Sequence, residues 1–286
     1  MPTEFCIDRY RTRQNFEKSA QSYDAAAVLQ QEVARRLIER LDYIKIQPQL
    51  AVDLGCGTGQ ISAELLKRYP KSQVLALDLA LNILEKARKK GSWLRKALPV
   101  CADVHQLPLK AHSVDLLMSS LMLQWCDDLP KVFNDMAYTM RSGGLLLFTT
   151  FGPDTLKELR QSWHSVDNFP HSSQYADMHD IGDELMKAGF SQPVMDMEII
   201  TMTYSSVDYL MRDLKDIGAS NTDTSRRKGL TGKARMQAFK QAYKQFQQED
   251  GLYPATYEVI YGHAWMPDQS LQKPAGVETF IPIKPI

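Results

Sequence analysis

Short apolar runs alternate with segments of helical spacing along the first two-thirds of the chain. The apolar runs are typical of buried strands, and the intervening segments place apolar residues three or four positions apart. The expected strands are 50–52, 74–77, 98–101, 114–118 and 145–148, and the clearest helices are 60–68 and 130–140. This alternation predicts a parallel sheet with helices on both faces, in which ligands bind at the carboxyl ends of the strands.

Two more strands are expected further along the chain. A helix at 180–189 ends in a glycine, a strand covers 195–204, and a β-rich run at 256–261 completes a seven-stranded, mostly parallel sheet of an α/β, Rossmann-like fold. The segment 205–255 between the last two strands is far longer than a usual connection. It therefore predicts a helical insertion before the last strand, and the helical spacing at 16–41 predicts an N-terminal cap.

Length and composition fit one such domain. The chain has 286 residues, of which 44% are hydrophobic, and this suffices for a large single core. We expect one domain over 1–266, made of a cap (1–45), a ligand-binding core (46–204), the insertion (205–255) and the last strand (256–266). Residues 267–286 contain four prolines and few core-forming stretches, which predicts a loosely attached tail.

The most informative motif lies between the first strand and the next helix, where residues 53–59 read Asp-Leu-Gly-Cys-Gly-Thr-Gly. Glycine permits positive φ and lets a ligand approach the backbone closely. The glycines fall at every second position, whereas a dinucleotide fingerprint places its last glycine to hold a pyrophosphate at the helix N-terminus. This spacing favours a cationic nucleoside that carries an amino acid, with a mere strand-to-helix turn as the alternative. The candidate residues are Asp53, Gly55, Cys56, Gly57, Thr58 and Gly59.

Acids follow the next two expected strands. Asp78 can accept two hydrogen bonds from a ribose diol, although alone it would equally suit a helix N-cap. Asp103 can accept from an adenine amino group, and a solvated loop acid explains it nearly as well. Leu79, Ala102 and Val104 are their expected neighbours in the site. With these acids, the glycine loop resembles motif I of the class I S-adenosylmethionine-dependent methyltransferases, in which Asp53 organises the loop or faces the ligand's ammonium group.

The net charge and the spacing of the cysteines limit the possible binding partners and the cellular compartment. The 34 basic and 34 acidic residues give zero net charge, so no global field selects nucleic acid. The four cysteines are scattered without metal-ligand spacing, and the histidines lack zinc-like spacing, so we expect no metal and a reducing compartment. No apolar run reaches membrane-spanning length. These features predict a cytoplasmic protein without membrane or nucleic-acid partners.

One segment breaks the charge balance. Residues 225–248 hold seven basic side chains and no acid. The segment can be a solvated helix face without a specific function, or it can be a docking face for an acidic partner. The seven residues are Arg226, Arg227, Lys228, Lys233, Arg235, Lys240 and Lys244.

Later blocks carry a more specific resemblance. They read Phe-Gly-Pro-Asp-Thr-Leu-Lys-Glu-Leu-Arg at 151–160, Asp-Met-His-Asp-Ile-Gly-Asp at 177–183, Pro-Val-Met-Asp at 193–196, Leu-Lys-Asp-Ile-Gly-Ala-Ser-Asn at 214–221 and Pro-Ala-Thr-Tyr-Glu at 254–258. From about residue 13 to 265 the chain resembles the malonyl-acyl-carrier-protein O-methyltransferases of biotin synthesis. The segment 119–125, with Ser119 and Gln124, is similar to the family segment that closes over the cofactor.

The resemblance implies methylation of the free malonyl carboxylate by S-adenosylmethionine, with S-adenosylhomocysteine as product. A carboxylate is already ionised at neutral pH, so no general base is needed. The resemblance also gives the basic insertion a partner, the acidic acyl carrier protein. Positioning residues are expected on segments that cover the sheet edge, and the candidates are Tyr23, Arg160 and His171. Packing of Tyr23 with Phe16, a surface salt bridge at Arg160 and helix capping at the histidines are the structural alternatives.

Two other functions stay open at the level of the sequence. A mitochondrial complex I assembly factor that hydroxylates a protein arginine shares several of the blocks, including Asp-Thr-Leu and Pro-Ala-Thr-Tyr. It predicts no methyl transfer to malonyl thioesters. A methyltransferase of small quinone or lipid precursors predicts an activity that is indifferent to a carrier protein.

Overall fold

A computed structural model gives the structure of the chain and describes residues 6–91 and 95–268. The tail expected at 267–286 lies outside the described residues from position 269 onward. Among the helices of the described part, none is both long and apolar enough to cross a lipid bilayer.

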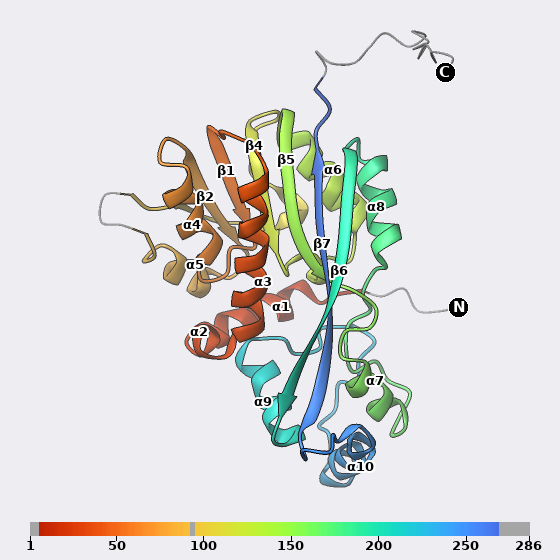
Figure 1. The fold of residues 1–286 in the computed structure, drawn as a ribbon. Helices are drawn as coiled ribbons and strands as arrows, with labels where there is room; N and C mark the ends of the chain where they lie inside the picture. The colour runs from red at the N-terminus through yellow and green to blue at the C-terminus, as the bar shows by residue number, and fades with distance from the viewer. Residues whose placement is uncertain (1–5, 92–94, 269–286) are drawn as a thin grey trace, which may run out of the picture.

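Within the described residues, seven strands form one sheet in the order β3-β2-β1-β4-β5-β7-β6 (Figure 1). Strands β1 to β5 are parallel, and β7 runs antiparallel to both β5 and β6. The bounds are β1 Leu50–Leu54, β2 Gln73–Asp78, β3 Leu98–Cys101, β4 Val114–Ser120, β5 Met140–Phe151, β6 Ser191–Tyr204 and β7 Tyr253–Trp265. The predicted fold class is confirmed, although β5 and β7 are longer than the apolar runs indicated.

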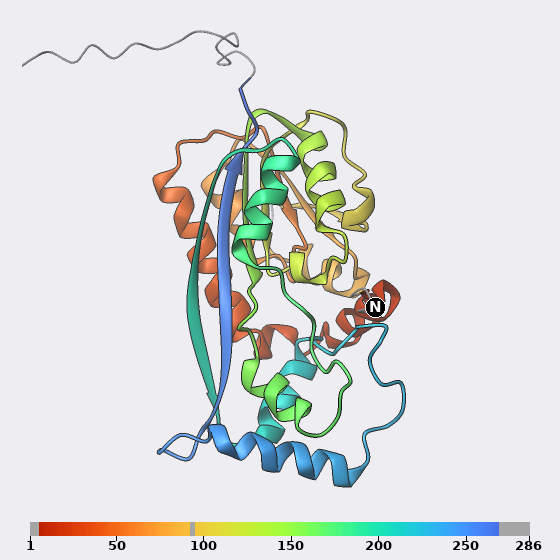
Figure 2. The same cartoon turned by 90° about the vertical axis from the view of Figure 1, so that its right-hand side faces the viewer.

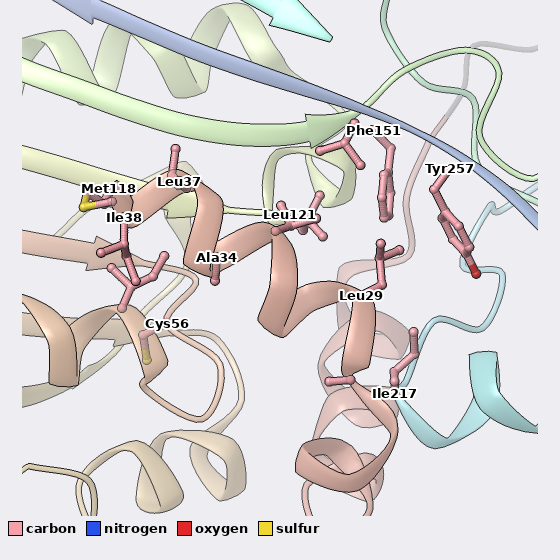
Figure 3. Packing of buried hydrophobic residues seen from close by; sticks show 14 of the residues in the cluster. Leu29, Ala34, Leu37, Ile38, Cys56, Met118, Leu121, Phe151, Ile217 and Tyr257 are labelled. Atoms are coloured by element: carbon pink, nitrogen blue, oxygen red, sulfur yellow. The ribbon is translucent and has the colours of Figure 1, made fainter. Parts of the chain in front are cut away.

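Helices cover both faces of the sheet because the buried strands are apolar on both sides. In β5, Leu145 and Leu147 join a cluster with α3 and α4, whereas Leu146 and Phe148 join a second cluster with α6 and α8. Figure 3 shows the first cluster around α3. The helices are α1 Arg9–Ser19, α2 Tyr23–Ala26, α3 Val28–Glu39, α4 Gln60–Arg68, α5 Leu81–Ala87, α6 Leu129–Thr139, α7 Lys157–His164, α8 Met178–Lys187, α9 Val207–Asp216 and α10 Lys233–Tyr243. Short 3-10 helices are η1 Arg40–Tyr43, η2 Val104–Gln106, η3 Leu123–Trp125 and η4 Lys244–Phe246.

Strands β6 and β7 continue as a two-stranded ribbon past the end of β5. Their pairing runs from Ser191 opposite Trp265 to Tyr204 opposite Tyr253, whereas β5 leaves β7 at Val259. The projecting part of the ribbon carries α7, α9 and α10 (Figure 1). The insertion is thus two helices joined by the loop 217–232, packed on the ribbon beyond the main sheet.

The N-terminal segment links this ribbon region to the sheet edge. Its helical spacing is interrupted twice, by the turn at residues 20–22 between α1 and α2 and at Ala27 between α2 and α3. The Ser22 Oγ donates to the Asp216 carbonyl at 2.8 Å, and the backbone N–H of Asp8 donates to the Thr222 carbonyl at 2.9 Å. Figure 2 shows α1 beside the start of the loop 217–232. The cap therefore contacts both the core and the insertion.

Candidate functional site

The loop after β1 is left-handed at each of its three glycines, with φ of +71° at Gly55, +53° at Gly57 and +84° at Gly59. A Cβ on Gly55 would lie 2.4 Å from the Cγ of Met122, and a Cβ on Gly59 would lie 2.8 Å from that of Ala87. A Cβ on Gly57 would meet nothing closer than the Tyr23 hydroxyl at 3.9 Å. Packing therefore requires glycine at the first and last positions, while Gly57 presents bare backbone to an open space.

Two carboxyl groups hold this loop, Asp53 from the buried interior and the partly buried Asp78 from the cavity wall. Asp53 is 1% exposed and accepts from the N–H and Oγ of Ser62 at 2.8 and 2.6 Å. Asp78 accepts from the N–H groups of Gly57 and Ala80, both at 2.9 Å. Burial raises the pKa of Asp53 to about 7 and that of Asp78 to about 6, and no described lysine or arginine offsets either shift. A cationic ligand beside them would favour their ionised forms.

The open space before Gly57 is a cavity at the carboxyl ends of β1, β2 and β4. It contains about 780 Å³ of empty space, part of it open to solvent. The predicted cofactor residues that line it are Gly55, Gly57, Asp78, Leu79, Ala102, Asp103 and Val104, and Tyr23 lines it as well.

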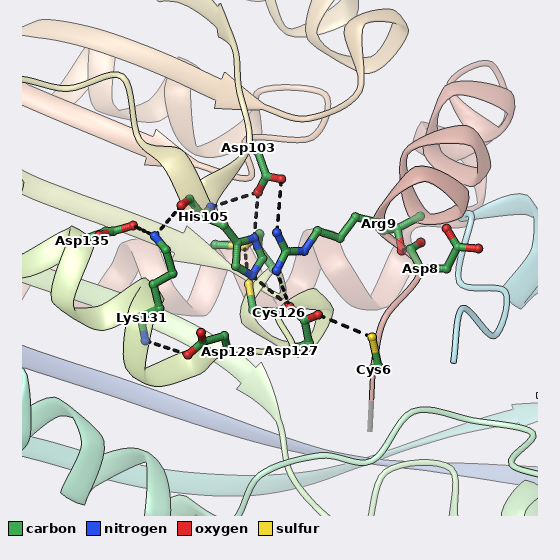
Figure 4. Close-up of polar contacts among 12 residues, drawn as sticks. Cys6, Asp8, Arg9, Asp103, His105, Cys126, Asp127, Asp128, Lys131 and Asp135 are labelled. Carbon is green, nitrogen blue, oxygen red and sulfur yellow. Dashed lines mark hydrogen bonds and ion pairs between the residues drawn. The ribbon is translucent and has the colours of Figure 1, made fainter. Parts of the chain in front are cut away.

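One end of this cavity is closed by a polar network around the predicted Asp103, and the sequence did not predict its other members, Arg9, His105 and Asp127 (Figure 4). Asp103 accepts from the backbone N–H of His105 at 2.9 Å and lies 2.8 Å from the His105 Nδ1. Arg9 donates to Asp127 at 2.8 Å and lies 3.9 Å from Asp103. Burial alone would raise the pKa of Asp103, but the hydrogen bonds from His105 together with the charges of His105 and Arg9 lower it. This carboxylate is therefore a charged, fixed acceptor at the cavity wall.

The remaining predicted cofactor residues lie behind the cavity wall or beyond it. The side chain of Ser119 is fully buried, and its neighbour Ser120 lines the cavity instead, because successive strand residues face opposite sides. The residues of the motif that do not line the cavity are Asp53, Cys56, Thr58 and Gly59. Gln124 lies in the adjoining cavity, where its Nε2 donates to the Leu121 carbonyl at 2.6 Å.

That second cavity lies between the first one, α7 and the insertion, and contains about 1910 Å³ of empty space, part of it open. Phe16, Tyr23, Leu121 and Trp125 line both cavities. The rings of Phe16 and Trp125 meet edge to face with centroids 5.2 Å apart. Burial raises the pKa of Tyr23, so its phenol stays protonated at neutral pH. These four side chains form the junction of the two cavities.

The three predicted positioning residues are not brought together. Tyr23 is at the junction, and His171 lines the second cavity with its ring stacked on Trp163 at a centroid distance of 3.9 Å. The His171 Nε2 lies 2.7 Å from the Asp167 Oδ1. Arg160 lines neither cavity, because its guanidinium donates to the carbonyls of Pro153 and Thr155. No three metal-ligating side chains gather among the residues the structure describes.

The seven basic residues divide into two groups. Arg226, Arg227 and Lys228 line the second cavity from the loop 217–232. Lys233, Arg235 and Lys240 lie on α10, and Lys244 opens η4. Two of these have acidic neighbours, since Lys240 pairs with Asp208 at 2.6 Å and Arg235 lies 3.9 Å from Asp167.

Comparison of the chain with known proteins first gives its fold class. A family model described as "Methyltransferase domain" matches residues 52–148, from β1 to β5. The YcgJ protein from Bacillus subtilis shares the fold with a TM-score of 0.58 at 12% identity, over 82% of this chain and 98% of that one. Together with the glycine loop and the cavity above it, these matches define the class I methyltransferase fold.

Curated relatives then give the family. The malonyl-[acyl-carrier protein] O-methyltransferase of Gallionella capsiferriformans is 50% identical over 270 residues, covering 92% of this chain and 93% of the relative. The protein of the same name from Methylovorus sp. is 46% identical over 279 residues, covering 96% and 94%. The chain belongs to the malonyl-[acyl-carrier protein] O-methyltransferase family, as the sequence blocks predicted.

Proposed function

We propose that the chain transfers the methyl group of S-adenosylmethionine to the free carboxylate of malonyl-acyl carrier protein. The products are the malonyl methyl ester, which enters biotin synthesis, and S-adenosylhomocysteine. The observation that carries this proposal is the pair of cavities that meet at Tyr23. A donor in the first cavity and an acceptor in the second would face each other at that junction.

The residues of the first cavity fit S-adenosylmethionine. The bare backbone at Gly57 leaves room for the amino-acid part, Asp78 ends β2 where a ribose diol would lie, and Asp103 is a fixed acceptor for an adenine amino group. Burial raises the pKa of Asp78, which lines this cavity, to about 6, and a cation bound there would favour its ionised form. When bound, the donor supplies an electrophilic methyl group on a positively charged sulfur.

The chain's own contribution is positioning and exclusion of water. The malonyl carboxylate attacks in its ordinary ionised form, so no side chain has to remove a proton. Phe16, Leu121 and Trp125 surround the junction with apolar surface, which excludes water from the nucleophilic oxygen. Tyr23 keeps its proton and is available to donate a hydrogen bond that orients the carboxylate.

We also propose that the basic α10 region recognises the acyl carrier protein. Acyl carrier proteins present an acidic helical face, and the basic α10 region would attract it by charge complementarity. Lys233 and Lys244 are the cations of this region with no ion pair among the described residues, which supports a role for them in docking. We also propose that the reaction takes place in the cytoplasm without nucleic acid. Free thiols at Cys6, Cys56, Cys101 and Cys126 and zero net charge support this.

The experiment is intact-mass measurement of malonyl-acyl carrier protein after incubation with the protein and S-adenosylmethionine. We expect a gain of one methyl group that mild ester hydrolysis reverses. No gain, with cofactor binding intact, would contradict the proposal and favour a protein-modifying activity. An equal rate with a malonyl thioester that lacks the carrier would instead favour a small-molecule methyltransferase.

A further inference from the structure

The loop 217–232 places cations along the wall of the second cavity, whereas the lysines that follow it do not line this cavity. Arg226, Arg227 and Lys228 line this cavity, and Lys233 and Lys244 do not. Figure 2 shows the loop running from beside α1 down to α10. The basic segment is therefore not one uniform charged face, and its first three cations have a separate location.

The loop that carries them is held in place at several points. Thr222 accepts from the backbone of Asp8, and the N–H of Thr224 donates to the Cys6 carbonyl, both at 2.9 Å. The Asn221 side chain donates to the Pro170 carbonyl at 2.7 Å, and Asp223 accepts from the Ser225 N–H at 2.8 Å. The backbone that leads into Arg226 is thus preorganised, which lowers the entropic cost of holding a ligand.

Two polar atoms at this cavity lack partners. The Nε of Arg226 and the Oγ of Ser172 are buried and form no hydrogen bond with the described residues, and both residues line the cavity. No ion pair joins Arg226, Arg227 or Lys228 to a described carboxylate, in contrast to Arg235 and Lys240. Buried donors without acceptors are costly, so an anion with several oxygens is the ligand that this arrangement suits.

We propose that Arg226, Arg227 and Lys228, with Ser172, bind the phosphodiester of the carrier's phosphopantetheine arm, an inference that rests on the proposed function. The malonyl carboxylate must reach the junction at Tyr23, and these cations line only the second cavity. Leu156, Leu159 and Met211 give the same cavity apolar wall that suits the pantetheine chain. Arginine matches phosphate oxygens with two parallel N–H groups.

The test compares malonyl-pantetheine with malonyl-4′-phosphopantetheine, two probes that differ only in the phosphate. Their affinities for the full chain saturated with S-adenosylhomocysteine are measured by calorimetry. We expect the phosphorylated probe to bind at least about tenfold more tightly, the scale of charge-assisted hydrogen bonds. The triple variant Arg226→Gln, Arg227→Gln, Lys228→Gln should lose most of this gain.

A charge-matched control removes three exposed cations elsewhere, Lys45→Gln, Lys71→Gln and Lys110→Gln, and should keep the gain. Equal affinities of the two probes for the unmodified chain would overturn the inference, as would equal losses in the control and the triple variant. If the triple variant fails to bind S-adenosylhomocysteine, the single change Lys228→Gln at an exposed side chain replaces it and should lose part of the gain. Because this complex transfers no methyl group, failure here is distinct from failure of the proposed function, which the mass measurement reports.

Discussion

Replacing Gly55 with alanine tests how tightly the glycine loop and the segment over it fit together. The Gly55 backbone has φ +71°, and a Cβ there would lie 2.4 Å from the Cγ and 2.6 Å from the Cβ of Met122. These are the first two carbons of the methionine side chain, so rotation of its flexible end cannot relieve both contacts. The loop and the segment that contains Met122 would have to separate.

The magnitude follows from two independent costs. A left-handed backbone at a residue with a Cβ costs about 1–2 kcal/mol. Forcing an extra carbon into packed surroundings costs about a further 1–3 kcal/mol. We therefore expect Gly55→Ala to lower the free energy of unfolding by about 2–5 kcal/mol, a large part of the stability of an ordinary domain.

Gly143→Ala is the matched control, because Gly143 has φ +73° but nothing within 4 Å of the position that a Cβ would take there. It should lose only the backbone term, about 1–2 kcal/mol. Denaturant unfolding measures both variants, and calorimetry measures their affinity for S-adenosylhomocysteine. Since Met122 lines the cofactor cavity, Gly55→Ala should also weaken that affinity at least about tenfold, whereas Gly143→Ala should not.

A double-mutant cycle with Met122→Ala isolates the contact. Removing the methionine side chain should make Gly55→Ala less costly by about 1–3 kcal/mol than it is in the unmodified chain. Equal losses of stability in Gly55→Ala and Gly143→Ala, together with no coupling to Met122, would refute the reasoning. The glycine would then be required by its φ alone.

Three further predictions concern charge and protonation. Burial raises the pKa of Asp53 to about 7, so the folded state holds this proton more tightly than the unfolded state does. The free energy of unfolding therefore falls as the pH rises from 4 through 7. Asp53→Asn should thus gain up to about 4 kcal/mol relative to the unmodified chain between pH 4 and 8, and a constant difference in urea unfolding would contradict this. Lys233→Glu with Lys244→Glu should raise the KM for malonyl-acyl carrier protein about tenfold at low salt and spare malonyl-pantetheine, whereas equal effects on both substrates would exclude docking. Tyr23→Phe should lower kcat about tenfold and retain S-adenosylhomocysteine affinity. If kcat of the unmodified chain changes between pH 7 and 10 and kcat of Tyr23→Phe does not, the phenol titrates in this range and the reasoning is wrong.

The sequence predicts the sheet and the glycine loop well, because both depend on local patterns. Apolar runs mark buried strands, and glycines at alternate positions are needed wherever φ is positive and packing is tight. The predicted cofactor residue Ser119 shows the limit of such patterns, because its neighbour Ser120 lines the cavity instead. A one-residue difference in a strand exchanges the two faces of the sheet, and only the packing of Ser119 in the core decides which hydroxyl reaches the cavity.

Residues that are distant along the chain could not be placed from the pattern alone. Arg9 reaches Asp127 and Asp103 only because α1 folds across the ends of the strands. Arg160 has the right charge and follows β5, but its guanidinium satisfies the carbonyls of Pro153 and Thr155 in the turn before α7. The charge of this side chain can be read from the sequence, but its hydrogen-bond partners depend on which backbone carbonyls lie nearby in the fold.

The junction of the two cavities depends on contacts between the cap and the insertion. Phe16 and Tyr23 come from the cap, and Leu121 and Trp125 come from the segment after β4, so the junction exists only while the cap is docked. The cap is attached to the insertion through Asp8 and Ser22, and the loop that holds Arg226 begins at these contacts. A change in that loop can therefore reach the donor cavity through the backbone. This is why S-adenosylhomocysteine affinity has to accompany every measurement on a loop variant, since only a variant that retains it reports on the acceptor side alone.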